Sequence, residues 1–182
     1  MFLLIIFLLS VFCAIGLGIL SGLADFRGLR IPNIYPLLIA CAFVPAFGAA
    51  HFGGAGVMGP LWPHLAVGAG MLLVTFIMYS FHIFGGGDSK LLTAYALWTG
   101  LVGLLPLVFY MAISGGLLGI VTIFIRKKKP FKSPPEGSWI ARVQAGENRV
   151  PYGIPIGIGA LMAFVELGYL TPETLGRFLG GG

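Results

Sequence analysis

Long apolar runs separated by short polar segments fill almost the whole chain. The runs cover about residues 1–20, 34–50, 65–84, 89–105, 106–125 and 150–170. A helix needs about 20 residues to cross the roughly 30 Å hydrocarbon core of a bilayer. The pattern therefore predicts an all-α polytopic membrane protein, a bundle of about six transmembrane helices. Gly-x-x-x-Gly spacings at Gly18/Gly22, Gly115/Gly119 and Gly153/Gly157 favour closely packed helices within it.

The stretch from Ser89 to Ile125 decides the number of crossings. It is too long for one crossing, and a break is expected near Trp98–Gly100 or at Gly103–Pro106. With two crossings and the amino terminus outside, ten of the eleven Lys and Arg residues fall on one side, in segments 21–33, 85–90 and 126–149. The positive-inside rule makes that side cytoplasmic.

Composition supports a membrane protein and argues against several other classes. The 182 residues are 58% hydrophobic and 9% charged, whereas soluble domains carry about 25% charged residues. Nucleic-acid binding, a secreted disulfide scaffold and a separate nucleotide domain are therefore not expected. The two cysteines, Cys13 and Cys41, lie inside apolar runs, where a thiol behaves as a small hydrophobe. No basic residue precedes the first run, so we expect a retained helix rather than a signal peptide.

The segment at about 126–149 is the one sizeable polar region, with seven basic residues against Glu136 and Glu147. Basic residues near a membrane surface attract anionic lipid. The segment is expected to be a cytoplasmic loop that contacts such lipid, and the alternative is a docking surface for a protein partner.

Only six residues are acidic, and charges within membrane segments are costly and usually functional. Four of the six are assigned to the polar loop, the carboxyl-terminal tail or the outer end of the last helix: Glu136, Glu147, Glu166 and Glu173. Asp25 and Asp88 remain, at the cytoplasmic ends of the first and fourth helices. Two carboxyl groups in one partly dry site can share a proton, so that one activates water and the other polarises a scissile carbonyl. This aspartic-protease chemistry needs no metal or cofactor.

Gly85, Gly86 and Gly87 directly precede Asp88. Glycines free the backbone to turn and allow another chain to approach closely, so an extended substrate could pair with this segment. The alternative is an ordinary helix entry, where the helix dipole favours the negative charge of Asp88. Three roles are open for Lys90: it tunes Asp88, it contacts substrate, or it is a positive-inside anchor.

These residues carry a resemblance to a known family. Asp25 with Ile31-Pro32-Asn33, followed by Gly85-Gly86-Gly87-Asp88 and Lys90, resembles the type IV prepilin peptidases, which are Gly-x-Gly-Asp intramembrane aspartic proteases. Pro151-Tyr152-Gly153 is similar to the family's Pro-Tyr/Phe-Gly segment, which opens the last helix. Asn33, after Pro32, is expected to cap the second helix.

The resemblance implies a single membrane-embedded peptidase domain over residues 1–182, with Asp25 and Asp88 as the catalytic pair. Substrate-binding or site-shaping roles fall to Gly85, Gly86, Gly87, Lys90, Pro151, Tyr152 and Gly153. The implied substrate is a pilin or pseudopilin precursor, cut after its short basic leader at the cytoplasmic face of the bacterial inner membrane. Pilus assembly machinery is a further implied partner.

Longer members of the family carry an amino-terminal extension with paired Cys-x-x-Cys motifs and also methylate the new pilin terminus. This chain has neither feature, so N-methyltransferase activity is not expected, and the short form resembles peptidases of Flp or tight-adherence pili. Two alternatives use other chemistry. One is a small ion- or proton-coupled transporter that uses the same aspartates, and the other is a non-catalytic scaffold of a secretion or pilus machine.

Overall fold

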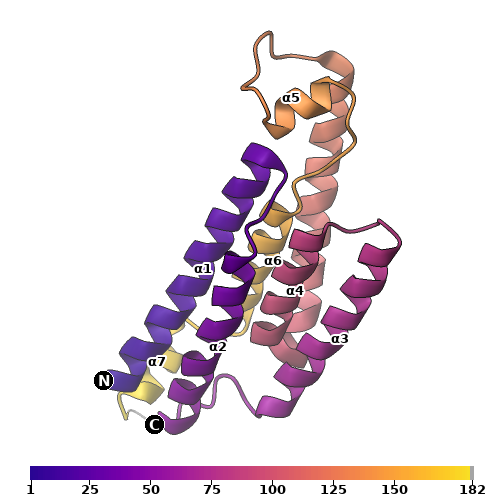
Figure 1. Ribbon diagram of the computed structural model, residues 1–182. Coiled ribbons are helices and arrows are strands. Elements are labelled where there is room, and N and C mark those ends of the chain that lie inside the picture. The colour runs from indigo at the N-terminus through magenta and orange to yellow at the C-terminus, as the bar shows by residue number, and fades with distance from the viewer. Residues whose placement is uncertain (181–182) are drawn as a thin grey trace.

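The computed structural model describes residues 1–180, which form seven helices and no strand (Figure 1). The helices are α1 (Phe2–Gly28), α2 (Ile34–Phe52), α3 (Leu61–Ser80), α4 (Gly86–Lys128), α5 (Trp139–Gln144), α6 (Gly153–Glu166) and α7 (Pro172–Phe178). Four of them, α1 to α4, are long and apolar enough to cross a membrane. The prediction of an all-α, multi-pass membrane protein is confirmed.

α4 consists of two helical arms joined at Gly100, which has φ 55° and ψ −159°. Glycine adopts this backbone conformation readily, whereas an L-residue pays a steric penalty there. The chain doubles back at Gly100, so the arms 86–99 and 101–128 run in opposite directions (Figure 1). The first of the two expected break positions is therefore correct. Pro106 stays inside the second arm, and the expected division at residues 105 and 106 is wrong by about five residues.

The two arms of α4, together with α1, α2, α3 and α6, make the six helical segments of the bundle. Their bounds differ from the apolar runs. α1 extends to Gly28 rather than to about residue 20, and α3 covers 61–80 rather than 65–84. α6 has 14 residues and is shorter than the expected run at 150–170. Hydropathy alone misplaces these ends because polar and small residues continue a helix wherever its backbone hydrogen bonds are satisfied.

α1 and α6 pack closely through small residues. A Cβ atom added at Gly22 would lie 3.2 Å from Cγ1 of Ile154, and one added at Gly157 would lie 3.6 Å from the carbonyl oxygen of Gly18. Apolar burial drives helix association only weakly in lipid, so close van der Waals contact between small residues takes that role. Two of the three predicted Gly-x-x-x-Gly pairs thus face each other across one helix interface.

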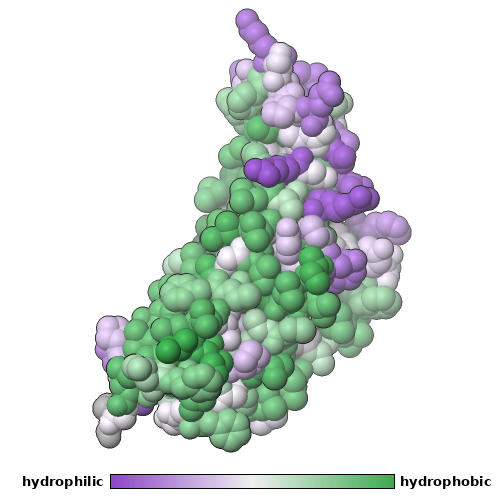
Figure 2. All heavy atoms as spheres, turned by 60° about the vertical axis from the view of Figure 1, so that its left-hand side comes forward, coloured by the Kyte–Doolittle hydropathy of each residue, from purple (hydrophilic) through white to green (hydrophobic). Residues whose placement is uncertain are grey.

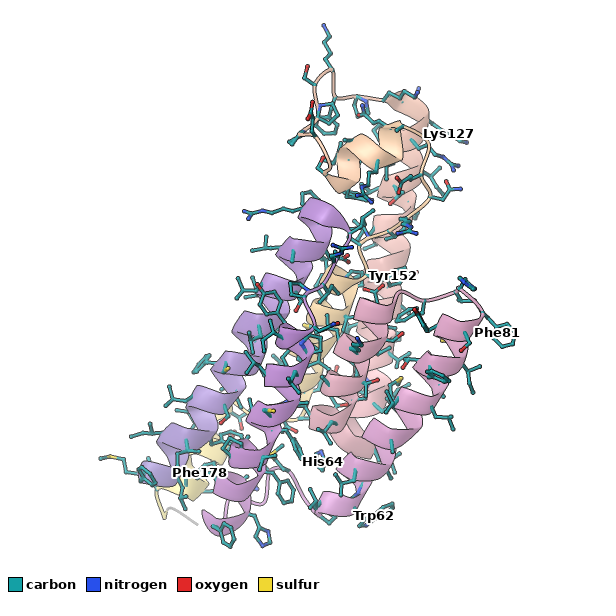
Figure 3. All side chains as sticks on the ribbon, in the orientation of Figure 1. Trp62, His64, Phe81, Lys127, Tyr152 and Phe178 are labelled. Atoms are coloured by element: carbon teal, nitrogen blue, oxygen red, sulfur yellow. The ribbon has the colours of Figure 1, made fainter. Side chains whose placement is uncertain are left out.

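His64 of α3 organises the opposite end of the bundle from α5 (Figure 3). Its side chain is buried, and its two ring nitrogens lie 2.9 Å from the carbonyl oxygen of Leu97 and 2.7 Å from that of Met58. Leu97 lies just before the kink at Gly100, where the regular helical hydrogen bonding is interrupted. His64 therefore connects the α2–α3 loop to the kinked part of α4.

The polar residues gather at the end of the molecule that carries α5 (Figure 2). The expected loop at 126–149 is partly helical, because α4 continues to Lys128 and α5 covers Trp139–Gln144. Trp139 is buried and its ring packs 5.4 Å from that of Phe26 in α1. Its indole nitrogen also donates a 3.0 Å hydrogen bond to the carbonyl oxygen of Arg149. α5 is thereby docked on α1, and it fixes the backbone that leads into α6.

Candidate active site

Asp25 is a buried carboxylate on α1. Because α1 continues to Gly28, Asp25 lies about one turn inside the helix rather than at its end. Only 5% of the surface of Asp25 is exposed. Its Oδ2 atom accepts a 2.8 Å hydrogen bond from the backbone N–H of Gly153, the first residue of α6. The first N–H groups of a helix have no acceptor within it. The carboxylate of α1 therefore satisfies a free donor of α6, and the two helix ends hold each other in place.

Gly153 allows this contact because it has no side chain. A Cβ atom added there would lie 3.0 Å from Cβ of Asp25 and 3.2 Å from both Oδ2 of Asp25 and Cδ1 of Ile31. Carbon atoms in contact normally lie about 3.5–4.0 Å apart. A larger residue would therefore push α6 away from the carboxylate.

Asp88 lies in the first turn of α4, which begins after Gly85. Added Cβ atoms would lie 2.5 Å from Oδ2 of Asp88 at Gly85, 3.2 Å from the Tyr79 ring at Gly86, and 3.0 Å from Cβ of Ile31 at Gly87. None of the three glycines has a positive φ. The triplet therefore provides space for its neighbours rather than an unusual backbone conformation. The helix-entry interpretation also holds, since the carboxylate lies at the amino end of α4.

Asp25 and Asp88 line the same two cavities, of about 610 Å³ and 440 Å³. Residues of α1, α3, α4 and the segment before α6 surround the larger cavity, and its walls include Tyr79, Phe84, Gly85, Gly86, Arg149 and Tyr152. The smaller cavity is lined by residues of the α1–α2 loop and the start of α4, among them Arg30, Asn33, Gly87 and Lys90. Pro151 is buried beside them but lines neither of these two cavities. Segments far apart in the sequence thus meet at two carboxyl groups.

Lys90 and Asn33 connect two of these segments. Nζ of Lys90 donates a 2.9 Å hydrogen bond to Oδ1 of Asn33. Asn33 occupies the position before α2, but its side chain makes no capping bond, so the expected cap is wrong. Its φ of −59° and ψ of −23° are helical, whereas a capping side chain normally requires an extended backbone. Instead, Asn33 places the charge of Lys90 at the rim of the smaller cavity.

Several residues that line the cavities were not expected from the sequence in this role, among them the polar residues Arg149, Asn148 and Tyr79. Arg149 lines both cavities, although the charge pattern assigned it only to the basic cytoplasmic segment. Its position two residues before Pro151, in the motif shared with the family, could have indicated that it lies near the site. Asn148 and Tyr79 also line the larger cavity. No sequence signal identifies Tyr79, because its place depends on how α3 is rotated against α4. Within residues 1–180, no group of three or more His, Cys, Asp or Glu side chains is arranged to hold a metal ion.

Residues 11–120 match the type IV leader peptidase family. The chain belongs to this family. The matched region includes Asp25, the three glycines and Asp88, and it ends within the second arm of α4. The resemblance carried by these residues is therefore confirmed, and the match supports a peptidase over the transporter and scaffold alternatives. No curated protein and no solved structure matches this leader peptidase.

Proposed function

We propose that this leader peptidase is an intramembrane aspartic endopeptidase in which Asp25 and Asp88 jointly activate a water molecule. The main support is that both carboxyl groups, carried by different helices, line the same two cavities. A structural role for Asp25 would explain its bond to Gly153, but it would not explain why the second acidic side chain faces the same space.

The proposed chemistry needs two carboxyl groups in opposite protonation states. The ionised one accepts a proton as the water oxygen attacks the carbonyl carbon of the scissile bond, and the protonated one donates a hydrogen bond to the carbonyl oxygen. The C–N bond then breaks, and the departing nitrogen takes up a proton from the pair. The bond from the Gly153 N–H holds Asp25 in a fixed orientation, which removes the cost of positioning it during the reaction.

The remaining expected site residues take supporting roles in this proposal. Gly85, Gly86 and Gly87 let Asp88 and its neighbours pack closely at the start of α4, and the first N–H groups of α4 are proposed to pair with an extended peptide beside Asp88. Lys90 holds the α1–α2 loop against α4. Pro151 and Tyr152 lead the chain into α6, where Gly153 contacts Asp25.

The proposed substrate is a pilin or pseudopilin precursor, of the small Flp type, cut between its basic leader and its apolar helix. The clustering of basic residues around the cavities and α5 supports an active site at the cytoplasmic face of the bacterial inner membrane, with the amino terminus outside. We propose one membrane-embedded peptidase domain, in which the 126–149 segment contacts anionic lipid. Pilus assembly machinery is the proposed protein partner, and the proposed activity is limited to peptide-bond hydrolysis.

The test is processing of a Flp-type precursor by purified enzyme in proteoliposomes. Asp25→Asn and Asp88→Asn should each lower the rate by at least about 10²–10⁴-fold, the usual contribution of a general acid or base. Glu166→Gln is the matched control, because Glu166 accepts a 2.7 Å hydrogen bond from Tyr110 on α4 and lines neither cavity. Wild-type processing by either folded Asn variant would overturn the assignment of that residue. A wild-type enzyme that cuts no peptide bond would favour the transporter or the scaffold.

A further inference from the structure

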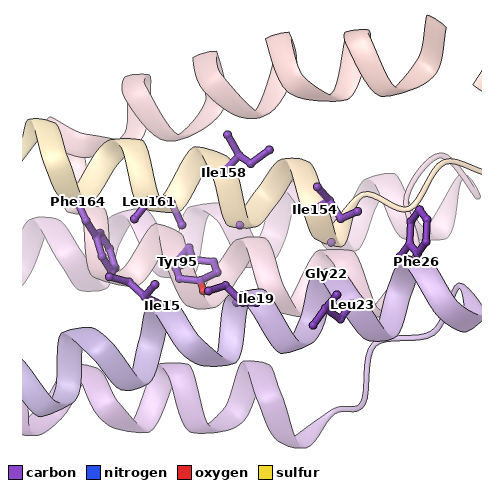
Figure 4. Close-up of a pocket in the computed structure, with 14 residues that line it drawn as sticks. Ile15, Ile19, Gly22, Leu23, Phe26, Tyr95, Ile154, Ile158, Leu161 and Phe164 are labelled. Carbon is purple, nitrogen blue, oxygen red and sulfur yellow. The ribbon is translucent and has the colours of Figure 1, made fainter. Parts of the chain in front are cut away.

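An apolar groove runs between α1 and α6 (Figure 4). It has a volume of about 470 Å³, and its lining residues are apolar except for Tyr95. The Tyr95 hydroxyl is turned away to donate a 2.8 Å hydrogen bond to the carbonyl oxygen of Ala14. The groove therefore offers no free hydrogen-bonding side chain, and a suitable occupant is itself apolar.

Small and aliphatic residues of α1 and α6 line most of the groove. Its lining includes Gly18 and Gly22 of α1 and Gly157 of α6, which lie where the two helices pack closely against each other. Exposed aliphatic side chains border it, such as Ile19 of α1 and Ile158 of α6. These aliphatic side chains can make van der Waals contact with an apolar helix that lies along α1 and α6.

One end of the groove meets the candidate active site. Gly153 lines the groove, and its N–H donates to Asp25, which lines the two cavities. On α1 the groove extends from Phe26 back to Ile15, a length of about 16 Å at 1.5 Å per residue. It therefore leads from the carboxylates to about the middle of the bilayer.

We propose that this groove binds the apolar helix of the precursor directly after the scissile bond. The inference rests on the proposed function, in which the cut falls just before that helix. A helix seated here places its first residue beside Asp25 and about its first eleven residues along α1. Gly153 lines the groove and donates to Asp25, so a polypeptide can continue from the groove to the carboxylates, and this continuity favours a peptide over a lipid chain.

The first test fills the groove without disturbing the core. Ile19 and Leu20 are neighbours on α1, are 60% and 46% exposed, and differ in that Ile19 lines the groove and Leu20 does not. Ile19→Trp should lower kcat/KM for the precursor by about tenfold, while Leu20→Trp should leave it unchanged. If Ile19→Trp and Leu20→Trp both process the precursor as fast as the wild type does, the groove does not bind the precursor helix.

The second test locates the bound helix directly. Cys13 and Cys41 are replaced by alanine, and Asp88→Asn keeps the precursor uncut. Ile19→Cys should then form a disulfide with a cysteine placed about six residues after the cut, since both helices rise 1.5 Å per residue from the level of Asp25. Phe76→Cys on α3 is the control, because Phe76 is 61% exposed and does not line the groove.

The combined results of the processing and cross-linking experiments distinguish a failure of the groove proposal from a failure of the proposed function. Processing by the wild type with cross-linking at Ile19→Cys supports both. Processing with cross-linking at Phe76→Cys instead, or at neither position, overturns the groove and leaves the peptidase intact. Failure of the wild type to process the precursor overturns both.

Discussion

The contact between Gly153 and Asp25 makes a sharp prediction for Gly153→Ala. The added methyl group would lie 3.0 Å from Cβ of Asp25 and 3.2 Å from its Oδ2. Normal carbon contacts are about 3.5–4.0 Å. Either α6 or the carboxylate must therefore move by about 0.5–1 Å.

The effect on catalysis should exceed the effect on stability. Overpacking of this kind lowers the free energy of unfolding by about 1–3 kcal/mol. Replacing glycine by alanine in a helix raises it by up to about 1 kcal/mol, which offsets part of that loss. A displacement of about 1 Å at a reacting group can lower the rate by about 10²-fold. We therefore expect kcat to fall by about 10- to 100-fold, with a small decrease in the thermal unfolding temperature and a smaller change in KM.

The assay measures kcat and KM for precursor processing in proteoliposomes, together with thermal unfolding in detergent. Gly28→Ala is the matched control, because Gly28 lies one turn after Asp25 on α1 and an added Cβ would meet no atom within 4 Å. It should behave as the wild type does. A folded Gly153→Ala enzyme with wild-type kcat would refute the claim that the amino end of α6 positions Asp25.

Three further predictions concern the kink and the rim of the site. Gly100→Ala should lower the free energy of unfolding by at least about 1–3 kcal/mol, because φ 55° with ψ −159° is strained for alanine; an unchanged melting temperature in detergent would contradict this. His64→Leu removes the one hydrogen bond that a neutral imidazole can donate to the carbonyl oxygens of Leu97 and Met58, at a cost of about 1–3 kcal/mol, whereas His51→Leu, at an exposed position, should be nearly neutral in the same melt. Lys90→Met breaks the bond to Asn33 and should lower kcat/KM by about 2- to 10-fold. Asn33→Ala should have the same effect, and additive losses in the double variant would show that the two residues act separately.

Much of the membrane organisation was predictable from the sequence. Apolar runs partition into lipid according to their own character, so their order along the chain already predicts a multi-pass, all-α protein. The family motif likewise lies in contiguous residues, from Gly85 to Asp88, and needs no knowledge of packing. The two isolated aspartates were identifiable because charge is so scarce in this chain.

Packing decided the rest. The hydrogen bond from Gly153 to Asp25, the pairing of Lys90 with Asn33, and the place of Tyr79 beside Gly86 all depend on how helices are rotated and shifted against one another. Many small residues over long segments set these rotations together, and no local pattern records the result. The sequence by itself therefore determined which residues are costly to place in a membrane, while only the tertiary structure decided which of them share a cavity, because close contact depends on the register between distant helices.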